Sequence, residues 1–448
     1  MSIKPTPEKP PCFDPGEPRF WDVKDLEGEM RRAFEICHSC RMCVGYCGSF
    51  PALFDRIDER HEKQGQPHDA TSLDAADMRK VVDLCWQCKI CYVKCPYTPD
   101  DKHAWALDFP RVLWREKVVR TAREGNTLQE MILGEPGVLG RLTAGPMAPV
   151  ANFVAAQRLV RKAGEVLAGI SADFPLPTYA TEPFDRWFRR HKPAAGAGAN
   201  GEVAIFSTCL VDYNKPTTGH WAVRVLEHAG MRVTRPAQVC CGMPNMDTGD
   251  LDSFREKAAR NVASLAAEVR AGRPIVVPGP SCSMTLRKEY PEILKTDDAR
   301  LVAANTFDLM EYLWKLWRDE KLPRTFKTSL GKVAYHAPCH LRAQRISLPA
   351  RTLLEKIPDT EVDVVEQCSA VDGTWGMKAE YYEMGVKYAK KLARGIDAAE
   401  AKYVASDCPL ASQRIMRENH VQVTHPVELL ARAYGLTGLT GLTGLTAE

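Results

Sequence analysis

Two short runs of four cysteines constrain this chain more than any other feature. Both follow the pattern C-x₂-C-x₂-C-x₃-C, and their members are Cys37, Cys40, Cys43 and Cys47, then Cys85, Cys88, Cys91 and Cys95. Runs with this spacing hold [4Fe–4S] clusters, whose irons are bound by cysteine thiolates. Zinc sites instead favour two C-x₂-C pairs separated by a loop. The sequence therefore predicts two [4Fe–4S] clusters.

The spacing also predicts which cysteines share a cluster. Thiolates at intervals of three residues on a tight loop reach three corners of one cubane, whereas the fourth cysteine of the run points away and binds the neighbouring cluster. We therefore assign Cys37, Cys40, Cys43 and Cys95 to the first cluster, and Cys85, Cys88, Cys91 and Cys47 to the second.

Composition excludes several other classes of protein. The 448 residues are 45% hydrophobic and 26% charged, with a formal net charge of +3, which is too small to argue for nucleic-acid binding. The amino terminus lacks the apolar core of a signal peptide, and no apolar run is long enough for a membrane-spanning helix. Clustered cysteines without a signal peptide indicate reduced thiols and metal, so we expect a cytoplasmic protein.

The chain divides by pattern into six segments. We expect helices at 24–36, 50–64 and 72–83, the first and last of which lead into the cysteine runs. These helices favour a helical ferredoxin domain. The predicted segments are a disordered tail (1–22), the two-cluster ferredoxin domain (23–125), a helical basic connector and linker (126–201), two repeated lobes (202–325 and 326–434) and a low-complexity tail (435–448).

A glycine pattern in the linker has the wrong setting for a dinucleotide site. Gly196, Gly198 and Gly201 fit G-x-G-x-x-G, but a dinucleotide fingerprint follows a strand and opens a helix. This one follows a linker and opens the strand-like run EVAIFSTC. We therefore expect neither flavin nor NAD on this chain.

The second half of the chain repeats itself. Cys209, Cys240 and Cys282 recur as Cys339, Cys368 and Cys408, and each follows a strand-like run. Strands that alternate with helices predict α/β lobes with largely parallel sheets. Cysteines at the carboxyl ends of such strands lie where open α/β sheets bind ligands. The predicted fold is therefore α plus α/β: a helical two-cluster domain followed by two cysteine-rich lobes.

These runs resemble a known family. VCCGMP, with its flanking cysteines, resembles the cysteine-rich CCG domain of heterodisulfide-reductase-type proteins, and FSTCLVDYNKP, PSCSMTLRKEYPEIL and YHAPCHLRAQ extend the likeness. The whole arrangement, two ferredoxin runs followed by two CCG lobes, is similar to the iron–sulfur subunit of bacterial anaerobic glycerol-3-phosphate dehydrogenase. The resemblance implies electron transfer between a flavoprotein dehydrogenase and a quinone or a disulfide.

The departures from the complete CCG pattern distinguish the two lobes. Lobe one keeps Cys209, Cys240, Cys241 and Cys282, with Thr285 in place of the last cysteine, and four thiolates suffice for a third cluster. Lobe two keeps only Cys339, Cys368 and Cys408, with Ser369 and Ala411 in the places of cysteines. Zinc, completed by His336 or His340, and an empty lobe are the two alternatives for lobe two.

We therefore predict an iron–sulfur electron-transfer subunit. Its partner would be a flavoprotein dehydrogenase of glycerol-3-phosphate or hydroxy-acid type, or another redox protein, and its acceptor a quinone. One alternative is a catalytic subunit that reduces a disulfide or peroxide-linked acceptor, and another is a metal-stapled docking scaffold. Basic helices around Arg111–Arg123 and Arg158–Lys162 leave open an acidic partner or peripheral contact with the inner face of the cell membrane.

Overall fold

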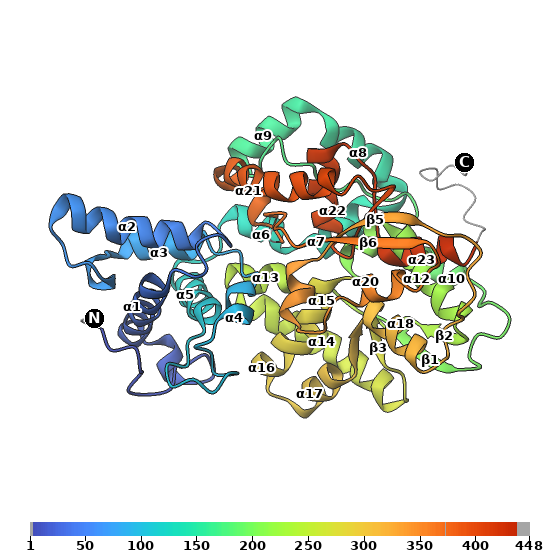
Figure 1. The fold of residues 1–448 in the computed structure, drawn as a ribbon, viewed down its shortest axis with the longest axis horizontal. Coiled ribbons are helices and arrows are strands. Elements are labelled where there is room, and N and C mark those ends of the chain that lie inside the picture. The colour runs from blue at the N-terminus through green and yellow to red at the C-terminus, as the bar shows by residue number, and fades with distance from the viewer. Residues whose placement is uncertain (1–2, 372, 437–448) are drawn as a thin grey trace. The chain divides into compact units, whose positions relative to one another are not determined.

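The computed structural model describes residues 3–371 and 373–436, and the chain forms two compact units (Figure 1). Unit 1 contains residues up to 134 together with two short later segments, 244–254 and 373–375. Unit 2 contains the rest. Of the expected low-complexity tail, the part from 437 onward lies outside the described residues.

Unit 1 is helical, as expected. Asp22 caps the first long helix by accepting from the backbone N–H groups of Lys24 and Asp25, and Asp74 forms a capping box with Asp77 on the third. The three helices expected from periodicity are confirmed as α1, α2 and α3. The helices are α1 (Val23–Cys40), α2 (Ser49–Gln64), α3 (Ala75–Asp83), α4 (Ile90–Lys94), α5 (Phe109–Glu124) and α6 (Leu128–Gly134), with the 3₁₀ turns η1 (Pro18–Trp21) and η2 (Ala70–Ser72).

The amino-terminal segment differs from the disordered tail that its composition predicts. Phe20 is fully buried against Trp114, with ring centroids 5.7 Å apart, and Cys12 is buried rather than a surface thiol. The fully buried guanidinium of Arg115 on α5 donates to the carbonyl oxygens of Arg19 and Phe20. Hydrogen bonds from the buried guanidinium group of Arg115 thus order an amino-terminal segment whose composition predicts disorder.

Unit 1 also receives one segment from each lobe, immediately beyond the second cysteine position of the repeat. In segment 244–254, Gly249 has φ +86° and lies so close to the backbone of Lys117 that a Cβ would clash at 2.5 Å, and Thr121 Oγ1 donates to the carbonyl of Thr248 at 3.0 Å. In segment 373–375, Trp375 packs on Trp86 at 5.3 Å. Unit 1 is therefore built from three separate stretches of the chain.

Unit 2 contains two four-stranded sheets with the same topology. Their orders are β2-β1-β3-β4 and β6-β5-β7-β8, and every pair is parallel, so the sequence repeat is also a structural repeat. The strands are β1 (Gly201–Ile205), β2 (Met231–Thr234), β3 (Ile275–Val277), β4 (Thr306–Asp308), β5 (Gly331–His336), β6 (Thr360–Val365), β7 (Tyr403–Ser406) and β8 (Val423–Thr424).

Helices connect and cover these strands. Before the first sheet come α7 (Pro136–Thr143), η3 (Gly145–Met147), α8 (Ala148–Ala156), α9 (Arg158–Ala168) and α10 (Phe184–Arg190). With the first sheet are α11 (Cys209–Tyr213), α12 (Pro216–His228), α13 (Met243–Thr248), α14 (Leu251–Arg270), α15 (Pro280–Met284), the π-turn η4 (Thr285–Glu289), α16 (Tyr290–Leu294), α17 (Asp297–Ala304) and α18 (Leu309–Arg318). With the second are α19 (Cys339–Ala343), α20 (Pro349–Leu354), η5 (Trp375–Met377), α21 (Ala379–Ala398), α22 (Pro409–Asn419) and α23 (Pro426–Ala433).

The two sheets share one hydrophobic core. Val203 and Val276 of the first sheet belong to the same buried cluster as Val333 and Val362 of the second. Between the sheets, Thr218 Oγ1 donates to Glu428 at 2.9 Å, and α12 packs against α23. Lobe two has in addition a smaller buried cluster of its own, which includes Leu392, Val404 and Ile415.

Arg115 offers a test of how the amino-terminal segment is held. Besides the two carbonyl contacts it donates to Asp25 at 2.8 Å, so Arg115→Ala removes a buried cation with several acceptors. We expect a loss of about 3 kcal/mol in the free energy of unfolding and faster proteolysis before residue 22. Chemical denaturation and limited proteolysis measure the two effects. Arg123→Ala, at an exposed position on the same helix, is the control. Equal stability of the two variants would contradict this role.

Candidate iron–sulfur centres

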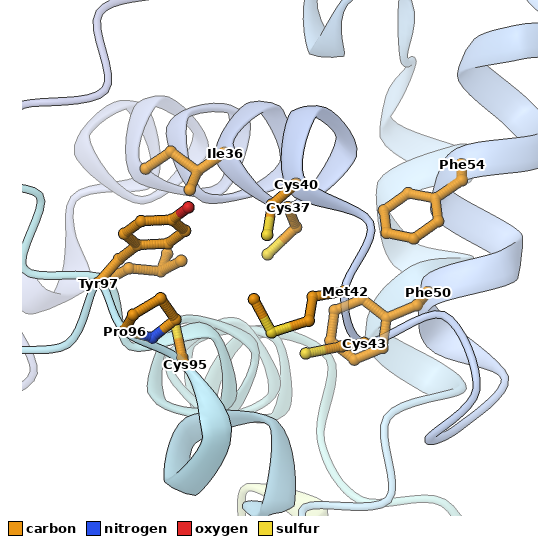
Figure 2. A pocket seen from close by; sticks show the side chains of 11 residues that line it. Ile36, Cys37, Cys40, Met42, Cys43, Phe50, Phe54, Cys95, Pro96 and Tyr97 are labelled. Carbon is orange, nitrogen blue, oxygen red and sulfur yellow. The ribbon is translucent and has the colours of Figure 1, made fainter.

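The first group of thiols gathers cysteines from both runs. Cys37 and Cys40 lie in the last turn of α1, Cys43 in the turn that follows, and Cys95 at the end of α4. All four line one cavity with apolar neighbours that include Met42 and Phe50, and Figure 2 shows these side chains around a common space. Burial raises the pKa of Cys37 well above its ordinary value, and the nearby thiols of Cys43, Cys95 and Cys40 raise it further.

The second group is assembled in the reciprocal way. Burial raises the pKa of Cys47 well above its ordinary value, and the thiols of Cys85 and Cys88 add to the effect. The pKa of Cys91 is raised likewise, first by burial and then by Cys88, Cys85 and Cys47. The structure thus brings together the two sets of four cysteines in which the last cysteine of each run joins the other run. Binding of a cluster by each set stays a prediction.

Local backbone conformation explains how short runs surround a cluster-sized space. Arg41, Gln87 and Lys89 have φ values of 51°, 49° and 59°, in the left-handed region that residues other than glycine rarely adopt. Each lies between two cysteines of its run and turns the chain so that successive thiols face inward. Such backbone strain is concentrated at functional sites.

The chemistry of both groups fits a cluster better than free thiols. Burial and mutual repulsion oppose ionisation, as the rise in the pKa of Cys43 to about 11 illustrates. Iron–sulfur clusters bind thiolates and supply the positive charge that makes ionisation favourable. All sixteen cysteines fall in the described part of the chain, and no disulfide joins any of them there.

Lobe one brings its four predicted thiols together at the carboxyl edge of its sheet. Cys209 follows β1 and opens α11, Cys240 and Cys241 lie between β2 and α13, and Cys282 lies in α15 after β3. The Sγ atoms of Cys241 and Cys282 are 3.1 Å apart. Hydrogen bonds from the thiols of Cys209 and Cys241 lower the pKa of Cys240, so one thiolate is favoured within the group. Four thiols at one edge of the sheet, of which those of Cys240 and Cys241 are buried, match the donor set of a cluster.

Two residues that sequence reasoning missed hold this pair of cysteines. Asn261 on α14 donates to the carbonyl of Cys240 at 3.2 Å and accepts from the backbone N–H of Val239, and Tyr290 Oη donates to the carbonyl of Cys241 at 3.0 Å. Both side chains are fully buried. A signal existed for Asn261, because it interrupts an apolar helix face that includes Phe254, Ala258 and Leu265.

Two features beside Cys240 favour its thiolate form. A Cβ on Gly137, near the start of α7, would lie 3.4 Å from Cys240 Cβ and 3.6 Å from Cys209 Sγ, so the amino end of α7 approaches both thiols. Helix amino termini favour thiolates. The ammonium group of Lys257 also contributes to the lowered pKa of Cys240.

The missing fifth cysteine of lobe one lies in an irregular helical turn. Thr285, in its place, begins the π-helical turn Thr285–Glu289, is fully buried and donates to the carbonyl of Ser281 at 2.7 Å. Turns of this kind occur often at functional sites. The hydroxyl is thus engaged by the backbone of α15.

Lobe two places its cysteines at the corresponding positions after β5, β6 and β7. Cys339 opens α19, and the sulfurs of Cys368 and Cys408 accept from the backbone N–H groups of Ala370 and Ala411. Burial raises the pKa of Cys408, and the thiol of Cys282 contributes, so the cysteine-bearing edges of the two lobes face each other.

The histidines proposed to complete a zinc site are engaged elsewhere. His336 is hydrogen-bonded through Nδ1 to Ser406 Oγ at 2.9 Å and through Nε2 to the carbonyl of Gln367 at 3.2 Å, so both ring nitrogens are occupied. His340 Nδ1 lies 2.8 Å from Ser281 Oγ. Zinc on Cys339, Cys368 and Cys408 stays a prediction, and His336 is not available as its fourth ligand.

Comparison with known proteins agrees with this architecture. Residues 30–123 match the Fer4-like domain of citrate utilization protein B, and residues 203–287 and 333–410 match the cysteine-rich CCG domain. A subunit of anaerobic glycerol-3-phosphate dehydrogenase from Escherichia coli K12 is 32% identical over 313 residues, 68% of this chain and 77% of that protein.

Two further relatives extend the comparison. A fumarate reductase (CoM/CoB) subunit from Methanothermobacter marburgensis is 31% identical over 54% of this chain and 48% of its own length. Lactate utilization protein A from Bacillus pumilus is 28% identical over 51% of this chain and 98% of its own length. The chain belongs to the family of CCG-domain iron–sulfur oxidoreductase subunits, to which this glycerol-3-phosphate dehydrogenase component also belongs.

Proposed function

We propose that this protein relays electrons from a flavoprotein dehydrogenase, of glycerol-3-phosphate or hydroxy-acid type, to a quinone or another acceptor. The observation that carries the proposal is the grouping of Cys95 with Cys37 and of Cys47 with Cys85, together with the four thiols of lobe one. When bound, [4Fe–4S] clusters supply one-electron carriers. The names of the relatives, which are dehydrogenase, fumarate reductase and lactate utilization proteins, support a redox partner.

The segment that follows the paired cysteines of lobe one lies in the same unit as the second thiol group. Lys117 Nζ donates to the carbonyl of Cys85 at 3.4 Å, and the backbone of Lys117 is the surface against which Gly249 packs. The segment that contains Gly249 begins at residue 244, soon after Cys241 in the chain. A short covalent path therefore connects the surroundings of Cys85 with the paired cysteines of lobe one.

Lobe one is the proposed terminal or relay site, and lobe two its structural counterpart. Lobe one offers four thiols, and Asn261 and Tyr290 hold the backbone of the adjacent pair, whereas lobe two offers three thiols. In the alternative mechanism, lobe one itself reduces a disulfide or peroxide-linked acceptor. Iron content separates these functions from a docking scaffold. If the lobes only dock a partner, the protein should contain about eight irons per chain, whereas a cluster in lobe one would raise the content to about twelve.

The helices α8 and α9 support peripheral contact with a membrane. Phe153 on α8 is 69% exposed, and Leu159, Val166 and Leu167 on α9 are 86%, 83% and 75% exposed. Arg158, Arg161 and Lys162 lie on the same short helix, which has no buried residue. A helix with exposed leucine and valine on one side and basic residues on the other suits the surface of an anionic bilayer.

No helix within the described residues has the length and apolarity of a membrane-spanning segment. We therefore place the proposed contact at the bilayer surface, with α8 and α9 as the docking elements. An acidic protein partner is the other occupant that this surface could accept, and vesicle binding separates the two.

Crossed ligation can be tested by single substitutions. Cys47→Ser should change the EPR signal of the cluster built on Cys85, Cys88 and Cys91, because Cys47 lies with that group. Cys43→Ser is the matched control and should change the other signal. Low-temperature EPR of the anaerobically reduced variants measures this. If Cys47→Ser altered only the Cys37-side signal, the assignment would be wrong.

Because the two lobes differ in their number of cysteines, we expect a cysteine substitution to have different effects in each. Cys241→Ala should abolish electron delivery to the acceptor and lower the iron content from about twelve to about eight per chain, with both ferredoxin-type EPR signals kept. Cys368→Ala should lower the melting temperature with electron delivery retained. Acceptor reduction, iron analysis and thermal unfolding of both variants are the measurements. A Cys368→Ala protein that folds normally but delivers no electrons would contradict the assignment.

Membrane contact can be tested by flotation with vesicles. The wild-type protein should float with vesicles that contain anionic lipid and remain unbound with zwitterionic vesicles, and Leu159→Glu should abolish flotation because it places a charge on the apolar side of α9. Val23→Glu, at another exposed apolar position, should bind as the wild type does. Equal flotation of the two variants, or none by the wild type, would exclude this surface as a membrane contact.

A further inference from the structure

A polar cleft of about 600 Å³ opens on unit 1 where α1, α2 and the segment before η2 meet. Three donor atoms converge in it. His38 Nε2 lies 3.1 Å and His68 Nε2 2.8 Å from the same oxygen, Asp58 Oδ1, and the three atoms all lie within 4.8 Å of one another. They come from three separate segments, so local sequence alone does not place them together.

Packing holds both imidazole rings in position. The side chain of His38 is 7% exposed and lies against Phe54, with ring centroids 6.1 Å apart. His68 is half exposed, stacks on His61 at 4.6 Å and meets His38 edge-on at 5.1 Å. One ligand is therefore rigid and buried, and another is open to solvent.

The contacts around Asp58 already include one cation, the guanidinium group of Arg41. Arg41 donates to both oxygens of Asp58, at 2.9 and 2.6 Å, and its Nη2 also lies 2.5 Å from His38 Nε2. A carboxylate only accepts and a guanidinium group only donates, so the tautomer of His38 decides which of these two contacts its Nε2 makes. In either tautomer, Asp58 Oδ1 and His38 Nε2 both lie next to the positive charge of Arg41.

A neutral imidazole with its lone pair directed at the site is the form that binds metal. Two imidazoles and one carboxylate are ligands that zinc and related transition metals accept, and three protein ligands with one open position are a common arrangement for zinc. The cleft leaves room for water or an exogenous ligand in that fourth position. Arg41 is 43% exposed at the end of α1, so its side chain can turn toward solvent.

We propose that His38, Asp58 and His68 form a binding site for a divalent transition metal of the zinc class, in which the guanidinium group of Arg41 takes the place of the metal when none is bound. This site is separate from the cysteine-bound clusters and from the proposed electron relay. A simple ion-pair network is the competing explanation. Removing Arg41 distinguishes the two explanations. If its guanidinium group competes with a metal, its removal should raise the affinity of the site for that metal. If the residues form only an ion-pair network, its removal should produce no metal binding.

The test uses the holoprotein with its clusters intact. Zinc is titrated into wild-type protein in competition with a fluorescent zinc chelator. We expect the titration to add one zinc per chain that depends on His68, beyond the clusters and any zinc held by the cysteines of lobe two. His68→Ala should weaken zinc binding by about tenfold or more, since even loss of an outer hydrogen-bond partner of a ligand costs this much. Arg41→Ala should strengthen it. His420→Asn, at an exposed histidine in another part of the chain, should leave it unchanged.

The variants are chosen so that folding does not obscure the result. His68 and Arg41 are partly exposed, whereas His38 is buried beside Cys37, and unchanged EPR signals and melting temperature verify that each variant is intact. The proposal is overturned if neither the wild type nor Arg41→Ala binds zinc. It is also overturned if His68→Ala binds zinc as tightly as the wild type.

Discussion

Buried thiols that cannot ionise on their own are the constraint on which this structure depends. In unit 1, burial and the repulsion between neighbouring sulfurs raise the pKa values of Cys37, Cys47 and Cys91 well above the ordinary value. Bound iron supplies the compensating charge, so the free energy of cluster binding is also free energy of folding. The ends of α1 and α4 and the start of α2 all coincide with these cysteines.

The second half of the molecule depends on a different interaction, the core that its two sheets share. Val203 and Val333 occupy equivalent positions on β1 and β5 and belong to one buried cluster. Lobe two has Ser369 and Ala411 where the complete motif has cysteines. Because the core is shared, lobe one still needs lobe two for its stability. Shared packing explains why a lobe with an incomplete motif keeps a complete fold.

The sequence predicted the features that depend on spacing and periodicity. The cysteine intervals indicated the crossed grouping, and the strand-like runs before Cys209 and Cys339 indicated the parallel sheets. The three helices of unit 1 followed from their apolar periodicity and capping residues. These signals are local in the chain, which is why one sequence was sufficient.

Features that depend on contacts between distant segments could not be predicted in this way. Composition indicated a disordered start, but Arg115, far along the chain, orders it. The proximity of cysteines suggested His336 as a zinc ligand, but Ser406 and Gln367 occupy its ring. His38, Asp58 and His68 converge only when α1, α2 and the following loop pack together. Polar residues such as these carry no periodicity of their own.

The composition of unit 1 also has a consequence for how the protein is made. Cys37 lies with Cys95, so the first group of thiols is incomplete until residue 95 has left the ribosome. Domains generally fold as units during synthesis, with amino-terminal ones first. Unit 1, however, also includes residues 244–254 and 373–375. A nascent chain therefore carries an unfinished amino-terminal unit until residue 375 has been translated.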